Sequence, residues 1–210
     1  PNNVVNIPFD RTLEGTAGTL ALTAGMLDNS TYTLTVPNTA TAAITGGSAT
    51  SYVKGALARS IPASLASAAT YAFPVGKSGI NAFELVNPTT TASGTVTVKA
   101  EVFDAATGGT AGSLLGGINS NKYWAASITN GGANLTNTFI KLNDAPSGAD
   151  AIGASATLTG AYALVGGLNA TITATSITTT TPALTSLAGY FVMGTRATPV
   201  LSNLVITPIG

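Results

Sequence analysis

The chain has 210 residues, with eight Lys and Arg, eight Asp and Glu, and neither His nor Cys, so its formal net charge at pH 7 is zero. The missing His and Cys remove the commonest general base, the commonest transition-metal ligand, disulfides and thiolate nucleophiles. A net charge of zero offers no basic face to phosphates. We therefore expect a protein that is not an enzyme, uses no cofactor and binds no nucleic acid.

Only 8% of the residues are charged and 45% are hydrophobic, which is too apolar a composition for a disordered chain. A surface of short neutral side chains at zero net charge tends to associate. No apolar run approaches the length of a membrane span. The first residue is Pro rather than Met, as in a mature product whose signal segment has been removed. We therefore expect an extracellular protein at the cell surface that assembles with other copies of itself.

Short segments with apolar residues at alternate positions recur along the chain, and Gly, Asn, Asp or Pro separates them. The clearest example is residues 95–103, where Val96, Val98, Ala100 and Val102 alternate with polar or larger residues. No window has the spacing of an amphipathic helix. This pattern predicts an all-β fold, which could be a sandwich, a barrel or a solenoid.

The chain divides into three parts by composition. Residues 1–55 contain short, Thr-rich segments with Gly or Asn turns, and we expect solenoid-like turns or a small sheet there. From residue 56 to 198 the predicted strands are longer and the large aromatic residues gather, as the core of an antiparallel β-sandwich requires, of an Ig-like or jelly-roll-like kind. Residues 199–210 follow a linker-like stretch and contain strand-like sequence without a domain of their own.

Two stretches, SYVKGALAR at residues 51–59 and YAFPVGKSG at residues 71–79, carry a resemblance to a known group of proteins. With the strands around them, the chain from about residue 15 to 195 resembles modules in large secreted surface proteins of Bacteroidetes-type bacteria. In those proteins, Thr/Gly-rich solenoid-like turns run into a β-sandwich that bears a YxFPVG strand. The resemblance implies an extracellular structural or adhesive role, and it brings no catalytic residues with it.

Both ends of the chain are strand-like, apolar and free of charge. Each end could pair within its own fold, or it could add to a sheet edge of a neighbouring copy. Because donor and acceptor surfaces differ, such a contact propagates head to tail and gives an open polymer. We predict strand exchange, with the C-terminal segment as first choice of donor. The predicted interface residues are Leu201, Leu204, Ile206 and Ile209, followed by Val5, Ile7 and Phe9.

The alternative function is an adhesin module that binds a glycan or another surface through its loops. Tyr123 and Trp124 are candidates for an aromatic platform that stacks on a sugar. A lone Trp in a strand is also typical of a sandwich core. Concentration-dependent assembly would favour the structural subunit, and a glycan screen would test the adhesin directly.

Polar residues suggest a few further sites, each with a plainer explanation. Two carboxylates that face each other across a cleft could act as the catalytic pair of a glycosidase. The loop with Asn143, Asp144 and Asp150 contains oxygen ligands suited to Ca²⁺. The same loop is also typical of an Asx-capped turn. We predict neither a catalytic pair nor a metal site. The eight carboxylates are Asp10, Glu14, Asp28, Glu84, Glu101, Asp104, Asp144 and Asp150.

Two patterns come from the abundance of Thr. Thr171, Thr173 and Thr175 would share one face of a strand, as on an ice-binding surface, although an edge strand of any Thr-rich β protein has the same pattern. Three N-x-Ser/Thr triplets could accept glycans, and such triplets also arise by chance in this composition. They begin at Asn29, Asn134 and Asn169.

Overall fold

The computed structural model describes residues 3–66 and 69–198. These residues form strands and two short 3-10 helices, η1 (Thr41–Ala43) and η2 (Gly132–Asn134). The predicted all-β class is therefore confirmed. Within the described ranges, neither helix has the length or the apolar character needed to cross a membrane.

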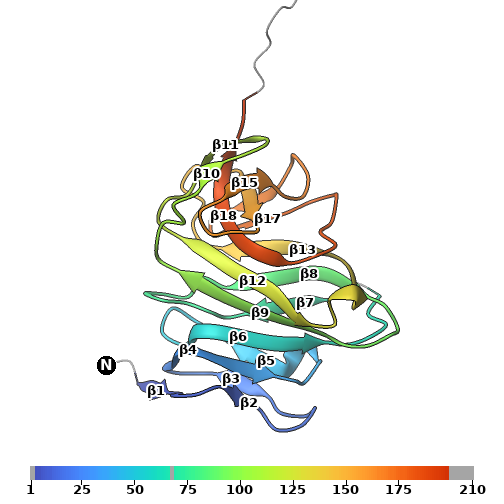
Figure 1. The fold of residues 1–210 in the computed structure, drawn as a ribbon. Coiled ribbons are helices and arrows are strands. Elements are labelled where there is room, and N and C mark those ends of the chain that lie inside the picture. Colours follow the sequence, from blue (N-terminus) through green and yellow to red (C-terminus); the bar gives the residue numbers. More distant parts are fainter. Residues whose placement is uncertain (1–2, 67–68, 199–210) are drawn as a thin grey trace, which may run out of the picture.

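Eleven strands form the main sheet. Nine of them follow the order β1-β4-β6-β9-β12-β18-β14-β15-β10, while β2 pairs with β4 and β11 pairs with β18 (Figure 1). From β6 to β15 each neighbour is antiparallel to the next, whereas β10 runs parallel to β15. The strands are β1 (Val4–Asn6), β2 (Arg11–Thr12), β4 (Met26–Val36), β6 (Val53–Ile61), β9 (Val96–Phe103), β10 (Thr110–Ala111), β11 (Leu115–Ile118), β12 (Tyr123–Asn130), β14 (Ala151–Ser155), β15 (Ala161–Leu164) and β18 (Ala188–Arg196).

Two smaller sheets complete the fold. Five antiparallel strands follow the order β16-β17-β13-β8-β7, and the two parallel strands β3 and β5 form a separate pair. Their bounds are β3 (Leu20–Leu22), β5 (Ile44–Gly46), β7 (Thr70–Phe73), β8 (Phe83–Thr90), β13 (Leu135–Asn143), β16 (Thr171–Thr173) and β17 (Ser176–Thr178).

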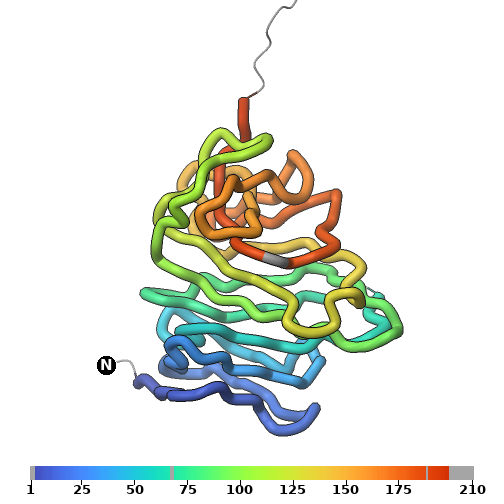
Figure 2. The backbone as a smooth tube through the Cα atoms, viewed as in Figure 1, coloured from blue at the N-terminus to red at the C-terminus, as the bar shows by residue number. Residues whose placement is uncertain are grey.

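The first strands of the main sheet are stacked in parallel. Arg11 of β2 lies beside Leu34 of β4, and Leu34 lies beside Leu57 of β6. Between these passages the chain visits the small sheet, where Leu20 lies beside Ile44. The chain therefore winds back to the same sheet on successive passages and leaves β1 and β2 at its edge (Figure 2). The boundary predicted between residues 55 and 56 falls inside β6.

The main sheet packs against the five-stranded sheet around one large core. The predicted alternation in β9 is observed, because Val96, Val98, Ala100 and Val102 are fully buried. The ring of Phe83 in β8 lies 5.8 Å from that of Phe191 in β18, which joins the two sheets. This layered arrangement is consistent with a β-sandwich.

The lone Trp belongs to this core. Trp124 is fully buried, and its indole Nε1 donates a hydrogen bond to the carbonyl of Asn81 at 2.8 Å. Its neighbour Tyr123 faces the opposite side of the sheet, because side chains alternate along a strand. There it joins a second cluster with Tyr162 and Val192. The expectation that the Trp anchors the core is confirmed.

Candidate assembly surfaces at the two ends of the molecule

The N-terminal edge of the main sheet consists of β1 and β2. Within the described residues, both strands pair with β4 alone. The N–H of Ile7 donates to the carbonyl of Asp28, and the N–H of Met26 donates to the carbonyl of Asn3, both at 2.8 Å. Successive residues of a strand direct their backbone groups to opposite sides. The N–H and C=O of Asn6 therefore face the open side, where another strand could pair with them.

Apolar side chains are exposed at this edge. Val5 is 57% exposed and Phe9 is 46% exposed, while Ile7 packs partly against the main core. The guanidinium carbon of Arg11 lies 4.2 Å from the centre of the Phe9 ring, in a cation–π contact. A groove of about 430 Å³ runs beside these residues, and Pro8, Phe9, Leu13 and Leu34 are among those that line it.

The last described residues lie in the upper part of the molecule. The N–H of Ala197 donates to the carbonyl of Leu114 at 3.0 Å, and the guanidinium of Arg196 donates to the carbonyl of Leu168. Asp150 accepts hydrogen bonds from the backbone N–H of Arg196 at 2.7 Å and from its Nε at 2.9 Å. Leu114 and Leu168 are 58% and 57% exposed, and we call these two leucines the exit patch.

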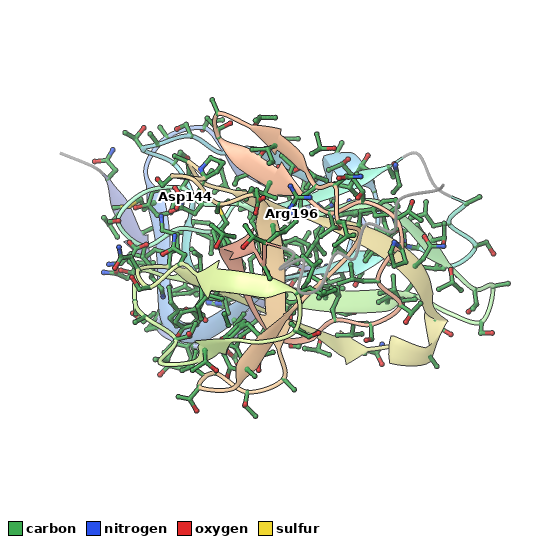
Figure 3. The ribbon with its side chains drawn as sticks, turned by 90° about the horizontal axis from the view of Figure 1, so that it is seen from above. Asp144 and Arg196 are labelled. Atoms are coloured by element: carbon green, nitrogen blue, oxygen red, sulfur yellow. The ribbon has the colours of Figure 1, made fainter. Side chains whose placement is uncertain are left out.

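The N-terminal edge and the exit patch lie at opposite ends. In Figures 1 and 2 the first strands form the lower end, and the chain leaves the upper end beside β10 and β11. Figure 3 looks down on that upper end and labels Arg196. A cavity of about 530 Å³ adjoins the chain there, lined by Leu114, Asp150, Leu168, Arg196, Ala197 and Thr198.

Only three of the seven predicted interface residues lie within the described residues. Val5 and Phe9 lie exposed at the N-terminal edge, and Ile7 is partly buried behind them. The other predicted residues, Leu201, Leu204, Ile206 and Ile209, lie outside the described residues. The exit patch was missed by the sequence analysis, because single leucines in Gly-rich loops carry no periodic signal.

Most of the carboxylates form ion pairs with a Lys or Arg side chain. Lys54 lowers the pKa of Asp28 by hydrogen bonding to it. Burial raises the pKa of Asp104, but hydrogen bonds from Ser78 and the charge of Lys122 outweigh it, so the net pKa is lowered. A glycosidase acid needs the opposite shift. Six of the eight carboxylates form ion pairs: Asp28–Lys54, Glu84–Lys141, Glu101–Lys77, Asp104–Lys122, Asp144–Lys122 and Asp150–Arg196.

The side chains considered as possible Ca²⁺ ligands have separate partners. The amide of Asn143 donates to Glu84, Asp144 pairs with Lys122, and Asp150 pairs with Arg196. Figure 3 shows Asp144 to the side of Arg196. In the part of the chain that the structure describes, no three acidic, His or Cys side chains come close enough to share a metal ion.

The fold excludes two candidate sites that the sequence suggested and corrects one predicted strand face. Tyr123 and Trp124 are buried and cannot form a sugar-stacking platform. Thr175 lies in the turn between β16 and β17, so it does not share a strand face with Thr171 and Thr173. Asn29 is fully buried and donates two hydrogen bonds to backbone carbonyls, so it is not an accessible glycosylation site in the folded protein.

A polar cleft on the outer face of the main sheet was also missed. It has a volume of about 340 Å³, and Lys99, Glu101, Ser127 and Tyr190 are among the residues that line it. These residues come from β9, β12 and β18, and Lys99 lies directly beside Ser127. Only the pairing of strands that are distant in the sequence brings them together.

The resemblance to secreted surface modules stays a prediction from the sequence. Comparison of the chain with protein-family models, with curated proteins and with solved structures finds no match in any of the three.

Proposed function

We propose that this protein is an extracellular structural subunit that polymerises head to tail into a filament or layer at the cell surface. Residues 199–210 of one copy add as a strand to the N-terminal edge of the next copy. The observation that carries the proposal is the position of the open edge at one end of the molecule and of the departing chain at the other (Figure 1). A donor and an acceptor at opposite ends make a heterologous contact, which propagates.

Addition of the same segment to the edge of its own molecule would use most of it to cross the sheet. Five strand spacings separate β18 from β1, which amounts to roughly 24 Å at about 4.8 Å each. An extended chain covers about 3.4 Å per residue, so about seven residues would be needed to cross the sheet from β18 to β1. Leu201 and Leu204 would then lie in the crossing and could not contact the edge. Pairing with another copy leaves the whole segment free to form the contact.

The chemistry of the two partners is matched. The segment has no charged residue, and its apolar residues include Leu201, Leu204, Ile206 and Ile209. The groove beside the N-terminal edge is lined by the apolar side chains of Ile7, Pro8, Phe9, Leu13 and Leu34 and by the polar or charged residues Asn6, Arg11, Thr12 and Glu14. Burying three or four such side chains is worth roughly 1.5 to 3 kcal/mol each, and each backbone hydrogen bond adds about 1 kcal/mol before entropic costs. These gains are large enough to hold a polymer.

We also propose that the strands up to β6 act as a short solenoid-like stack, followed by an Ig-like or jelly-roll-like sandwich body. Support for the stack comes from the parallel pairing of β2, β4 and β6 and of β3 with β5. Support for the sandwich comes from a chain that passes repeatedly between the main sheet and the five-stranded sheet. A stack ends in an open edge unless a cap covers it, which fits the acceptor role.

Electron microscopy and sedimentation velocity of three variants test the assembly. Truncation after Thr198 removes the donor, and Asn6→Pro removes one outward N–H from the acceptor while leaving the N–H of Ile7 bonded to β4. Asn6→Ser is the matched control, because it keeps the N–H. We expect filaments from the full chain and from Asn6→Ser, and monomers with unchanged thermal unfolding from the other two. Filaments from the truncated chain would contradict strand addition.

A second candidate function, glycan binding, is favoured by the cleft with Lys99 and Tyr190. Tyr190 packs edge-on against Tyr123, which holds its ring in place. Glu101 is paired with Lys77 at 2.7 Å, whereas Lys99 forms no ion pair within the described residues. An aromatic wall beside a free cation suits an acidic sugar. A glycan array probed with the wild-type chain and with Tyr190→Ala and Lys99→Ala tests this function, and equal binding by all three would exclude the cleft.

A further inference from the structure

We propose that the exit patch, Leu114 and Leu168, forms a second contact in the assembly by docking onto Val5 and Phe9 of the next copy. This inference rests on the proposed strand addition and names a surface that strand addition alone does not require. It concerns described residues on both sides, and it makes the joint between subunits an apolar contact in addition to a paired strand.

The backbone of Leu114 argues that its side chain has a role outside the fold. Leu114 has a φ of 63°, in the left-handed region that a bulky residue seldom occupies. The turn between β10 and β11 would be formed more easily by Gly or Asn. The side chain also gains little from burial, because it is 58% exposed. A strained, exposed leucine is typical of a binding surface.

Leu168 lies on the other side of the departing chain. The carbonyl oxygen atoms of Leu114 and Leu168 accept hydrogen bonds from Ala197 and Arg196, so both loops are attached to the chain where it leaves the fold. The charge of Arg196 is neutralised by Asp150 at 2.9 Å. Docking at the exit patch therefore buries two apolar side chains and no unpaired charge.

The position of the exit patch determines its occupant. Leu201 is three residues beyond Thr198, so it stands within about 10 Å of it even in an extended chain. When the segment pairs with the N-terminal edge of a second copy, the exit patch is brought against that same edge. The exposed side chains at that edge include Val5 and Phe9, which are about half exposed. Apolar surfaces on both sides would be withdrawn from water together.

The test uses the full chain and substitutions to Asn. Leu114→Asn suits the left-handed backbone, so the monomer should unfold at the same temperature or a higher one. The double variant Leu114→Asn with Leu168→Asn should raise the critical concentration for assembly by roughly tenfold or more, which corresponds to about 1.4 kcal/mol. Ile172→Asn is the matched control, because Ile172 is an exposed apolar residue of β16 with 47% exposure. It should leave the critical concentration unchanged.

A labelled peptide of residues 199–210 separates the two proposals. We expect it to bind the full chain, below its assembly concentration, equally well with and without the two Asn substitutions. If the peptide binds and the double variant assembles like the wild type, the exit patch is overturned while strand addition stands. If the double variant loses the peptide, the patch holds the segment itself and the docking proposal is wrong. A full chain that stays monomeric at every concentration overturns both.

Discussion

The guanidinium group of Arg59 lies over the ring of Tyr71 inside the fold, with Cζ 4.8 Å from the ring centre. Arg59 is fully buried and has no carboxylate partner among the described residues. Its Nη atoms donate instead to the carbonyls of Ala40, Thr41 and Ala72 at 2.9 to 3.1 Å. Burial lowers the pKa of Arg59 to about 10, so it stays charged at neutral pH. One side chain thus ties β6 to η1 and β7.

Replacing Arg59 by Met should destabilise the protein strongly. The substitution keeps an apolar stem but removes the Nη donors to the carbonyls of Ala40, Thr41 and Ala72, and each hydrogen bond from a charged donor contributes about 1.5 to 3 kcal/mol. We expect the free energy of unfolding to fall by about 3 kcal/mol or more, measured by urea denaturation. Arg11→Met on the exposed N-terminal edge is the control and should change it by less than about 0.5 kcal/mol. Equal urea midpoints for both variants would contradict this role.

Gly55 should tolerate no side chain. It has a φ of 144°, and a Cβ there would collide with Oδ1 of the buried Asn29. Gly55→Ala should therefore lower the free energy of unfolding by about 2 to 4 kcal/mol. Gly79→Ala is the matched comparison, because Gly79 has open space around the position of a Cβ. Thermal unfolding of the two variants checks this, and similar melting temperatures would mean that the Asn29 region can shift.

The free energy of unfolding should be constant around neutral pH and should fall in acid. The sequence has no His, while the folded-state pKa of Asp28, Asp104 and Asp150 lies below the ordinary value of 3.8. A carboxyl group with a lowered pKa stabilises the fold above its ordinary pKa and loses that contribution as the pH falls through the folded value. We expect a plateau from pH 5 to 8 and a loss of about 1 to 2 kcal/mol by pH 3.

The variant Asp104→Asn checks which groups cause the acid loss. It removes one titrating carboxyl group and its ion pair with Lys122, so its stability at pH 6 should be lower and its decline towards pH 3 shallower than in the wild type. Denaturation at a series of pH values gives both quantities. A decline as steep as that of the wild type would assign the acid sensitivity to the other carboxylates.

The fluorescence of the single Trp should report global unfolding. Trp124 is fully buried, and its indole is bonded to Asn81. Iodide should therefore quench the folded protein far less than the urea-unfolded chain. Because assembly is proposed to involve the two ends of the molecule, the quenching of Trp124 should be the same in monomer and polymer. Efficient quenching of the folded monomer would show that the core opens locally.

The alternation in β9 predicted buried positions correctly, because one face of that strand meets the core along its whole length. The turn at Thr175 was mispredicted because a run of threonines favours a continuous strand, while the hairpin between β16 and β17 is set by pairing with β13. Asn29 matched a glycosylation pattern, but its burial follows from the approach of Gly55 on the next strand. Contacts between residues distant in the sequence, such as Arg59 with Ala40, carry no local signal.

The stacking of strands from one end of the molecule to the other has a mechanical consequence for a polymer. A pulling force between neighbouring subunits would act across the strands, in the direction of their hydrogen bonds. Such a force separates the strands one after another, whereas a force along the strands would have to shear a whole ladder at once. The edge strands β1 and β2, which are held to β4 through three and two paired residues, would separate first. A filament of this protein should therefore lengthen in small steps under tension before it breaks.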